Sequence, residues 1–202
     1  MAPPPDLVLL PGLDGTGKLC AEFVRELGAR IVCHIVGYPK DRPLGYEELE
    51  KRVLAALPED RPYVLLGESF SGPIAIRIAA NPPQGLVGLI LCATFAKNPF
   101  PRLGWARPLA AFFPLKALPR WVRAPLMWGS FSARRAPAGL ERAIAGVSAA
   151  VIRHRIAALL SVDESGSLGR IPLPALVLKA RRDRVISAAA TELLLERLSA
   201  AR

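Results

Sequence analysis

The sequence has few residues that could cross-link the chain. It contains three cysteines and two histidines among 202 residues. Cys20, Cys33 and Cys92 are odd in number and widely spaced, and two of them lie inside apolar runs. This usage argues against a disulfide framework. We therefore expect buried free thiols in a reducing compartment, which indicates a cytoplasmic protein.

Long hydrophobic runs are also missing. Residues 1–6 have neither the basic residues nor the long apolar stretch of a signal peptide. The longest apolar run, residues 86–96, is about half as long as a membrane span requires. The sequence therefore predicts no stable membrane insertion.

Acidic residues are outnumbered by basic ones. The chain has 27 Lys and Arg against 17 Asp and Glu, which gives a net charge of +10. This excess would suit an anionic partner, but the arginines are scattered along the chain and form no block interleaved with aromatic residues. We expect a basic, solvated surface and no nucleic-acid partner.

Short apolar runs alternate with stretches that have helical spacing of apolar residues. The runs are residues 7–10, 31–36, 63–66, 86–93 and 175–179. The helix-like stretches are residues 18–27, 46–57, 70–80 and 188–198. This alternation predicts an α/β fold, in which right-handed crossovers place helices on both faces of a parallel sheet. The length and the apolar content favour a single domain over residues 1–202.

One segment, at about residues 98–169, interrupts this alternation. It carries no strand signal, and its first part is dense in proline, arginine and aromatic residues, including all three tryptophans, Trp105, Trp121 and Trp128. We interpret the segment as a helical insertion over the sheet.

A serine follows the run at residues 63–66. The sequence continues Gly67-Glu68-Ser69-Phe70-Ser71-Gly72 and then enters a helix-like stretch. A serine at a sharp turn between strand and helix is held in a strained backbone conformation that exposes its hydroxyl, and small residues on both sides let the strand and helix approach closely. The alternative is that Ser69 only caps a helix.

This arrangement resembles the α/β-hydrolase family, whose nucleophile turn reads Gly-x-Ser-x-Gly. Ser71 departs from the second glycine, although Gly72 follows directly, and we expect the departure to be tolerated. The resemblance implies a three-layer fold with Ser69 as the nucleophile. It also implies an oxyanion hole made by the backbone amides of Leu13 and Phe70, with no cofactor and no metal.

The loop that carries Leu13 has a second interpretation. Gly12, Gly17 and Lys18 fit the phosphate-loop motif G-x-x-x-x-G-K. However, Leu19 stands where a magnesium-binding Ser or Thr would follow, and the run at residues 86–93 ends without an acidic residue. Nucleotide binding is therefore the weaker interpretation.

Asp183 follows the last apolar run and resembles the acid of the family's catalytic triad, since the order serine then aspartate matches. A surface aspartate paired with Arg182 or Arg184 is the alternative. The family's histidine would come later, and no histidine follows Asp183. We expect His34, inside an apolar run, to be structural and His154 to face solvent, with a catalytic role as the lesser alternative for His154.

Two interpretations of the missing histidine stay open. In the first, the chain is a shortened form of a longer hydrolase, so that the fold is incomplete at its C-terminus and the uncovered strand edge favours self-association. In the second, the chain is a catalytically inactive binding or scaffold protein. We favour the first because it explains the absence of the histidine and of the family's final strand together.

The resemblance implies a hydrolase that acts on a carboxylic ester or thioester through an acyl-enzyme. Without a base, we expect weak or no activity in this 202-residue form. An apolar lid would bind a small-molecule acyl substrate through Trp105, Trp121 and Trp128. The alternative is that these tryptophans only pack the insertion onto the sheet.

Overall fold

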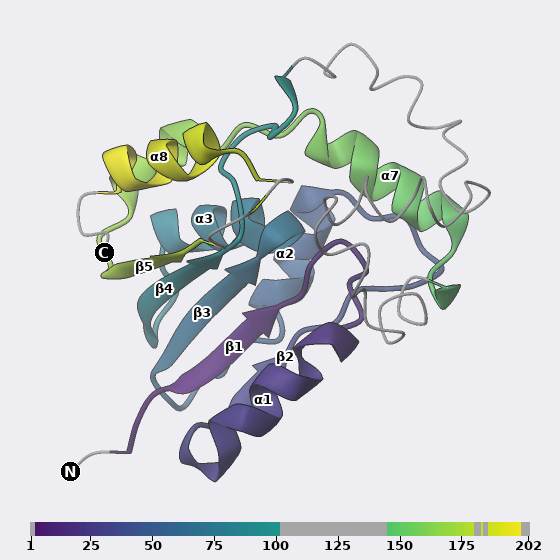
Figure 1. Cartoon of the computed structure of the whole chain (residues 1–202). Coiled ribbons are helices and arrows are strands. Elements are labelled where there is room, and N and C mark those ends of the chain that lie inside the picture. The colour runs from purple at the N-terminus through teal and green to yellow at the C-terminus, as the bar shows by residue number, and fades with distance from the viewer. Residues whose placement is uncertain (1–2, 102–144, 180–182, 184–185, 199–202) are drawn as a thin grey trace.

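A parallel sheet forms the centre of the computed structural model, which describes residues 3–101, 145–179, 183 and 186–198. In this part of the chain the sheet has five strands in the order β2-β1-β3-β4-β5 (Figure 1). The strands are β1 (Asp6–Leu10), β2 (Cys33–Ile35), β3 (Tyr63–Glu68), β4 (Leu86–Cys92) and β5 (Ala175–Leu178). Every pairing is parallel, so the carboxyl ends of all the strands share one edge of the sheet.

Helices cover both faces of this sheet. The described helices are α1 (Ala21–Leu27), α2 (Tyr46–Leu54), α3 (Gly72–Ala80), α7 (Ala149–Leu159) and α8 (Ala188–Arg197). Helix α1 packs on one face through Val24 and Leu27, whereas α2, α3 and α8 contribute to the core on the other face. The three-layer α/β fold expected from the alternation is confirmed.

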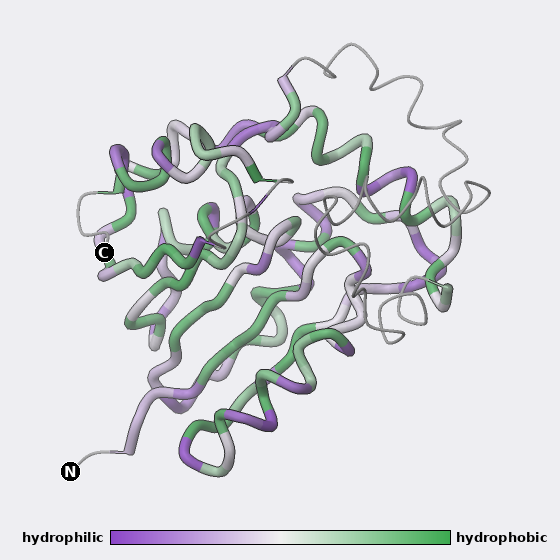
Figure 2. Tube along the Cα trace, viewed as in Figure 1, coloured by the Kyte–Doolittle hydropathy of each residue, from purple (hydrophilic) through white to green (hydrophobic). Residues whose placement is uncertain are grey.

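Strand β1 shows why these apolar runs form buried strands. Successive side chains point to opposite faces, so Val8 and Leu10 enter the core beneath α2 and α3, while Leu7 and Leu9 enter the core beneath α1. Figure 2 shows hydrophobic residues along much of the strands at the centre of the sheet. A run that is buried on both faces needs apolar residues at every position.

Helices α7 and α8 begin at serine caps. Ser148 accepts a hydrogen bond from the Val151 amide, 3.2 Å away, at the start of α7, and Ser187 accepts one from the Ala190 amide, also 3.2 Å away, at the start of α8. Each hydroxyl satisfies an amide that has no acceptor within its helix. The sequence therefore specifies where both helices begin.

The two ends of the insertion lie side by side. An isolated antiparallel bridge pairs Lys97 with Asp163, and the Asn98 amide donates to the Val162 carbonyl at 2.8 Å. The described residues between 145 and 170 contain α7 and a short 3-10 helix, and the helical insertion over the sheet stays a prediction. Trp105, Trp121 and Trp128 lie outside the described residues.

The outer strand β5 leaves apolar side chains uncovered. Leu176 is 41% exposed and Leu178 is 42% exposed, and neither belongs to the cluster beneath α1. Both side chains alternate with Ala175 and Val177, which face the opposite core. This is the surface at which the uncovered strand edge was expected, and self-association through it stays a prediction.

The expectation of buried thiols is only partly right. All three cysteines are free, but Cys20 alone is buried, while Cys33 and Cys92 are half-buried. Cys33 lies on the outer strand β2, and Cys92 ends β4 at the carboxyl edge of the sheet. Apolar runs at such positions do not guarantee burial, because fewer elements cover them.

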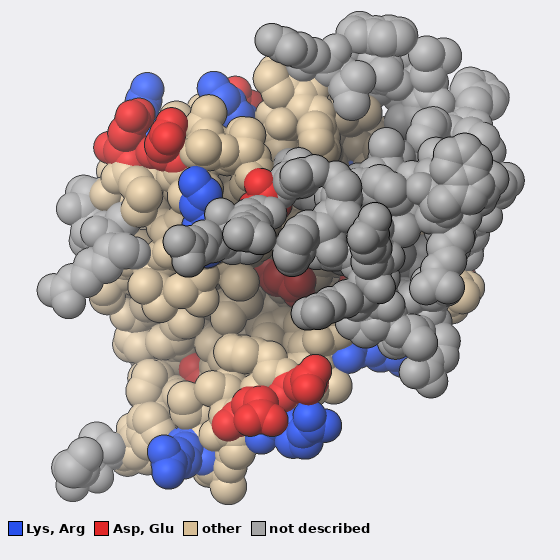
Figure 3. All heavy atoms as spheres, viewed as in Figure 1, with Lys and Arg blue, Asp and Glu red and all other residues tan. Residues whose placement is uncertain are grey.

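Charged side chains of both signs are interspersed on the visible surface (Figure 3). On α1, for example, Arg25 lies 3.3 Å from Glu22 and 3.9 Å from Glu26 in exposed ion pairs. Among the described helices, none has the length and apolar character needed to cross a membrane.

Candidate active site

Ser69 lies at a sharp turn between β3 and α3. The strand ends at Glu68, a 3-10 helix spans Ser69–Ser71, and α3 begins at Gly72. Ser69 has a φ of +48°, a conformation that costs a residue with a side chain about 1–3 kcal/mol. The strained turn expected at Ser69 is therefore present, and its half-buried side chain lies at the carboxyl edge of the sheet.

Two glycines allow this turn to close. A Cβ atom at Gly67 would lie 2.7 Å from the Cβ atom of Ala75, and a Cβ atom at Gly72 would lie 2.7 Å from the Cβ atom of Thr94. Real Cβ atoms essentially never approach so closely. Gly72 thus provides the close approach that the motif assigns to the second glycine.

Ser71 has a specific role that the sequence did not reveal. Its fully buried hydroxyl donates to the Pro11 carbonyl and lies 2.5 Å from the Tyr38 hydroxyl. Because a carbonyl can only accept, the single Ser71 proton goes to Pro11, and the Tyr38 hydroxyl must donate to Ser71. Ser71 therefore connects the turn after β3 to the loop after β1.

Leu13 and Phe70 follow two neighbouring strands at equal distances along the chain. Leu10 of β1 is paired with Gly67 of β3, so each of the two residues lies three positions beyond this pair. Phe70 is one of the first residues of its 3-10 helix, whose first amides have no acceptor within the helix. Within the described part of the chain, the Leu13 amide also has no acceptor. The oxyanion hole formed by these two amides stays a prediction.

Two carboxyl groups line the same loop. Asp14 is 5% exposed and accepts a hydrogen bond from the Thr16 amide at 2.8 Å. Glu68 lies 3.4 Å from the Cys20 thiol, and one of its oxygens is 3.6 Å from where a Gly12 Cβ would be. Burial raises the pKa of Glu68, and the charge of Asp14 adds to the rise. Carboxylates at these positions would repel a phosphate, which argues against the phosphate-loop interpretation.

Asp183 follows β5 at the same edge of the sheet. Its Oδ1 accepts a hydrogen bond from the Ile186 amide at 2.9 Å, and its side chain is half-buried. Its charge is one of the causes that raise the pKa of Cys92, after burial and Glu68, which places it near the end of β4. The proposed partners Arg182 and Arg184 lie outside the described residues.

The two histidines occupy different environments. The Nε2 atom of His34 lies 2.8 Å from Asp6, which also forms an ion pair with Arg61 at 3.1 Å. Asp6 begins β1, at the edge of the sheet opposite to Ser69, so the structural role expected for His34 is confirmed. His154 is exposed on α7, as expected, with its Nε2 atom 3.8 Å from where a Gly45 Cβ would be.

Thr94 supports the strained turn from the neighbouring strand. It is 3% exposed, and its hydroxyl donates to the Ser69 carbonyl. It follows Ala93, which also has a positive φ, of +45°. From the sequence we used Thr94 only as evidence that the strand ends without an acidic residue. Its position, a hydroxyl directly after a buried strand, was the one feature that could have indicated this hydrogen bond.

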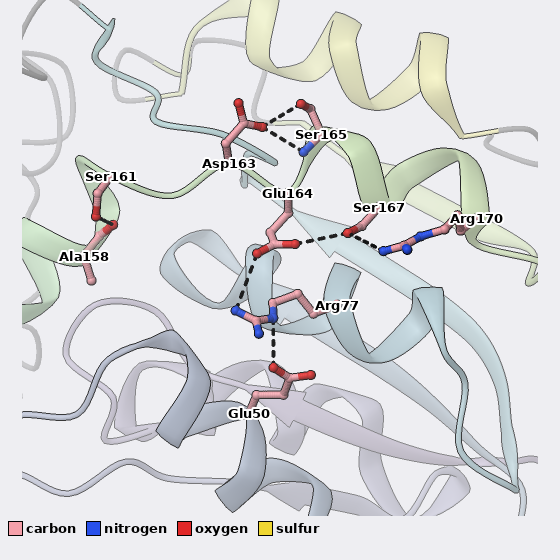
Figure 4. A network of polar contacts seen from close by, with 9 residues as sticks. All are labelled: Glu50, Arg77, Ala158, Ser161, Asp163, Glu164, Ser165, Ser167 and Arg170. Atoms are coloured by element: carbon pink, nitrogen blue, oxygen red, sulfur yellow. Dashed lines mark hydrogen bonds and ion pairs between the residues drawn. The ribbon is translucent and has the colours of Figure 1, made fainter.

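An ion-pair network holds the helix that follows Ser69 (Figure 4). The Arg77 side chain of α3 lies 2.8 Å from Glu50 of α2 and 3.6 Å from Glu164, which follows the insertion's return helix. Ser167 donates to Glu164 at 3.1 Å. These contacts join α3 to α2 and to the segment that follows α7, and none of them involves Ser69 or the loop after β1.

A separate hollow lies beside β2. Its volume is about 650 Å³, and it is lined by His34, Ile35, Val36, Gly37, Arg52, Ala55 and Ala56. It contains no residue of the turn after β3, so we do not assign the chemistry of Ser69 to it.

Comparisons with known proteins agree with the fold. The sequence profile of the alpha/beta hydrolase family matches residues 7–201. A hydrolase from Pseudomonas aeruginosa PA01 is similar in structure, with a TM-score of 0.79 and 22% identity over 100% of this chain and 81% of its own. The enol-lactonase from Burkholderia xenovorans LB400 has a TM-score of 0.81 and 21% identity over 98% of this chain and 81% of its own. No curated protein matches the sequence.

Proposed function

The chain belongs to the alpha/beta hydrolase family, and on this premise we propose that it is a serine hydrolase that cleaves a carboxylic ester or thioester through an acyl-enzyme. The observation that carries the proposal is the positive φ of Ser69 at a strand-turn-helix junction. Strain of this kind persists only where surrounding contacts maintain it, and it concentrates at functional sites. Gly67, Gly72 and Thr94 supply those contacts.

In the proposed reaction, the Ser69 hydroxyl oxygen attacks the carbonyl carbon of the substrate and its proton passes to a base. The electron pair of the carbonyl moves to its oxygen, and the amides of Leu13 and Phe70 stabilise that oxyanion. Collapse of the tetrahedral intermediate expels the alcohol or thiol, which takes up the proton. Water then releases the acid and regenerates Ser69.

Asp183 would orient the base in this scheme. Neither His34 nor His154 is hydrogen-bonded to Ser69 in the part of the chain that the structure describes. A serine hydroxyl without an adjacent base is a weak nucleophile. We therefore expect the 202-residue chain to react slowly with substrates in plain buffer.

Fluorophosphonate labelling, measured by intact mass and peptide mapping, tests this proposal. We expect slow labelling of Ser69 in plain buffer and faster labelling when imidazole supplies a base from solution. Ser69→Ala serves as the control for labelling at other residues, and His154→Ala shows whether that imidazole contributes. Labelling that survives in Ser69→Ala at the same rate would refute the assignment of the nucleophile.

A binding protein without hydrolytic activity is the second candidate. The observation that favours it is that neither histidine contacts Ser69 among the described residues. Such a protein would bind a medium-chain aryl ester in calorimetry but would not cleave it, even with imidazole present. Release of the phenol in the presence of imidazole, abolished by Ser69→Ala, would exclude this candidate.

A further inference from the structure

Arg155 is a buried charge close to the candidate active site. It lies on α7, is 1% exposed, and donates from Nη1 to the Leu13 carbonyl at 2.8 Å and from Nη2 to the Pro39 carbonyl at 2.9 Å. Its guanidinium carbon lies 5.5 Å from the centre of the Tyr38 ring. Among the described residues, no carboxylate lies within ion-pair distance of it. Its contacts are therefore carbonyl oxygens and an aromatic face.

Burying this guanidinium is costly. Burial lowers the pKa of Arg155, although Tyr38 and Asp14 partly oppose the change. The residue also shares a helical face with the buried Val151 and Ile152, where an apolar side chain would fill the space without the cost of desolvating a charge. A role limited to packing does not explain an arginine here.

Three carbonyls of the loop after β1 accept hydrogen bonds from residues outside the loop. The Pro11 carbonyl accepts from Ser71, the Leu13 carbonyl accepts from Arg155, and the Gly15 carbonyl accepts from the Tyr38 amide at 2.7 Å. The peptide between Gly12 and Leu13 therefore lies between two peptides whose carbonyls are held. Its own carbonyl, that of Gly12, accepts from the Gly15 amide at 2.9 Å.

The geometry of a trans peptide then fixes the Leu13 amide. In such a peptide the N–H and C=O bonds point in opposite directions, so the Leu13 N–H points away from the Gly15 amide that binds the Gly12 carbonyl. Gly15 lets the guanidinium come this close: a Cβ atom there would lie 2.5 Å from Arg155 Nη1, and its φ is +67°. The loop and the arginine are fitted to each other.

We propose that Arg155 is a positioning residue. By holding the Leu13 carbonyl it fixes the loop backbone, so that the neighbouring Leu13 amide can donate to an oxyanion formed at Ser69. The cation also adds a favourable field for the negative charge that develops there. This inference rests on the proposed function for its role in catalysis. The positioning of the loop by Arg155 is independent of it.

Hydrogen exchange tests the positioning without requiring activity. The variants are Arg155→Met, which removes the donors and the charge, and Arg155→Lys, which keeps the charge but cannot reach two carbonyls in the same fork. Arg77→Met is the control, because Arg77 is a less buried arginine that also has two partners but does not contact the loop. We expect the amides of residues 12–17 to exchange at least about tenfold faster in Arg155→Met, less so in Arg155→Lys, and as in the wild type in Arg77→Met.

The rate at which a fluorophosphonate labels Ser69 in the presence of imidazole tests the catalytic consequence. Loss of one oxyanion donor costs about 10²–10³ in rate, so a misplaced donor should slow labelling by about 10–100-fold in Arg155→Met and less in Arg155→Lys. Arg77→Met should stay within about twofold of the wild type.

The outcomes separate the two hypotheses. If the wild type does not label at Ser69, the proposed function fails, and hydrogen exchange alone decides whether Arg155 positions the loop. If Arg155→Met matches Arg77→Met in both measurements, the inference about Arg155 is wrong. If Arg155→Met does not fold, Arg155→Lys decides: unchanged exchange and unchanged labelling in that variant would overturn the inference.

Discussion

Replacing Ser71 by glycine would restore the Gly-x-Ser-x-Gly motif, yet we expect this change to destabilise the protein. Ser71 forms two buried hydrogen bonds, one to the Pro11 carbonyl and one from the Tyr38 hydroxyl. Each such bond contributes about 1 kcal/mol, and a buried donor without an acceptor costs about 1–3 kcal/mol. Since Tyr38 is only 4% exposed, its hydroxyl would lose its acceptor. The free energy of unfolding should fall by about 2–4 kcal/mol for Ser71→Ala, and somewhat more for Ser71→Gly.

Urea unfolding of a double-mutant cycle measures this effect. Tyr38→Phe removes the hydroxyl that Ser71→Ala leaves without an acceptor, so the second change should cost less in the background of the first. We expect a coupling energy of about 1 kcal/mol or more, as is typical of residues in contact. Additive effects, or a Ser71→Gly variant as stable as the wild type, would refute the hydrogen-bond assignment and leave Ser71 as a small residue that the turn merely tolerates.

Three further changes test other parts of the site. Gly72→Ala should lower the free energy of unfolding by about 1–3 kcal/mol in thermal melts, because its Cβ atom would collide with Thr94. Burial raises the pKa of Glu68 in the folded chain, so its contribution to stability is fully present below the unfolded pKa and is lost as the pH rises through the folded pKa. In urea melts from pH 4 to 8, the free energy of unfolding should therefore depend less on pH in Glu68→Gln than in the wild type. If an apolar insertion binds the acyl chain, each buried methylene adds about 0.8 kcal/mol, so octanoate esters should react faster than acetate esters. Changing Trp105, Trp121 or Trp128 to alanine, one at a time, should lower the ratio of the octanoate rate to the acetate rate by a larger factor than it lowers the acetate rate itself.

The sequence was sufficient for the elements and for the turn, because both depend on local patterns. A strand that is buried on both faces, such as β1, needs apolar residues at nearly every position, and such a short continuous run is typical of few other structures. The turn at Ser69 requires small residues at fixed distances along the chain, and these can be counted directly. Boundaries were less certain: β2 is limited to Cys33–Ile35, where it pairs with Leu7 to Leu9, although the apolar run is longer.

The contacts that hold the loop after β1 could not be predicted in the same way. Ser71 reaches Pro11 across 60 positions of sequence, and Arg155 reaches Leu13 across 142. A hydrogen bond from a side chain to a distant carbonyl leaves no periodic pattern, because any residue supplies a carbonyl. The one available signal was an arginine on the apolar face of a helix, beside Val151 and Ile152.

The topology of the sheet explains why these contacts converge between β1 and β3. From β1 the chain crosses to β2 on one side by way of α1, whereas from β3 it crosses to β4 on the other side by way of α3, which lies on the opposite face. The loops that leave the two strands therefore diverge at the carboxyl edge, which is where parallel α/β sheets bind their ligands. A diverging loop has no neighbouring strand to fix its backbone. Arg155, Tyr38 and Ser71 hold its carbonyls from three other segments, so the backbone around Leu13 is constrained although no strand pairs with it.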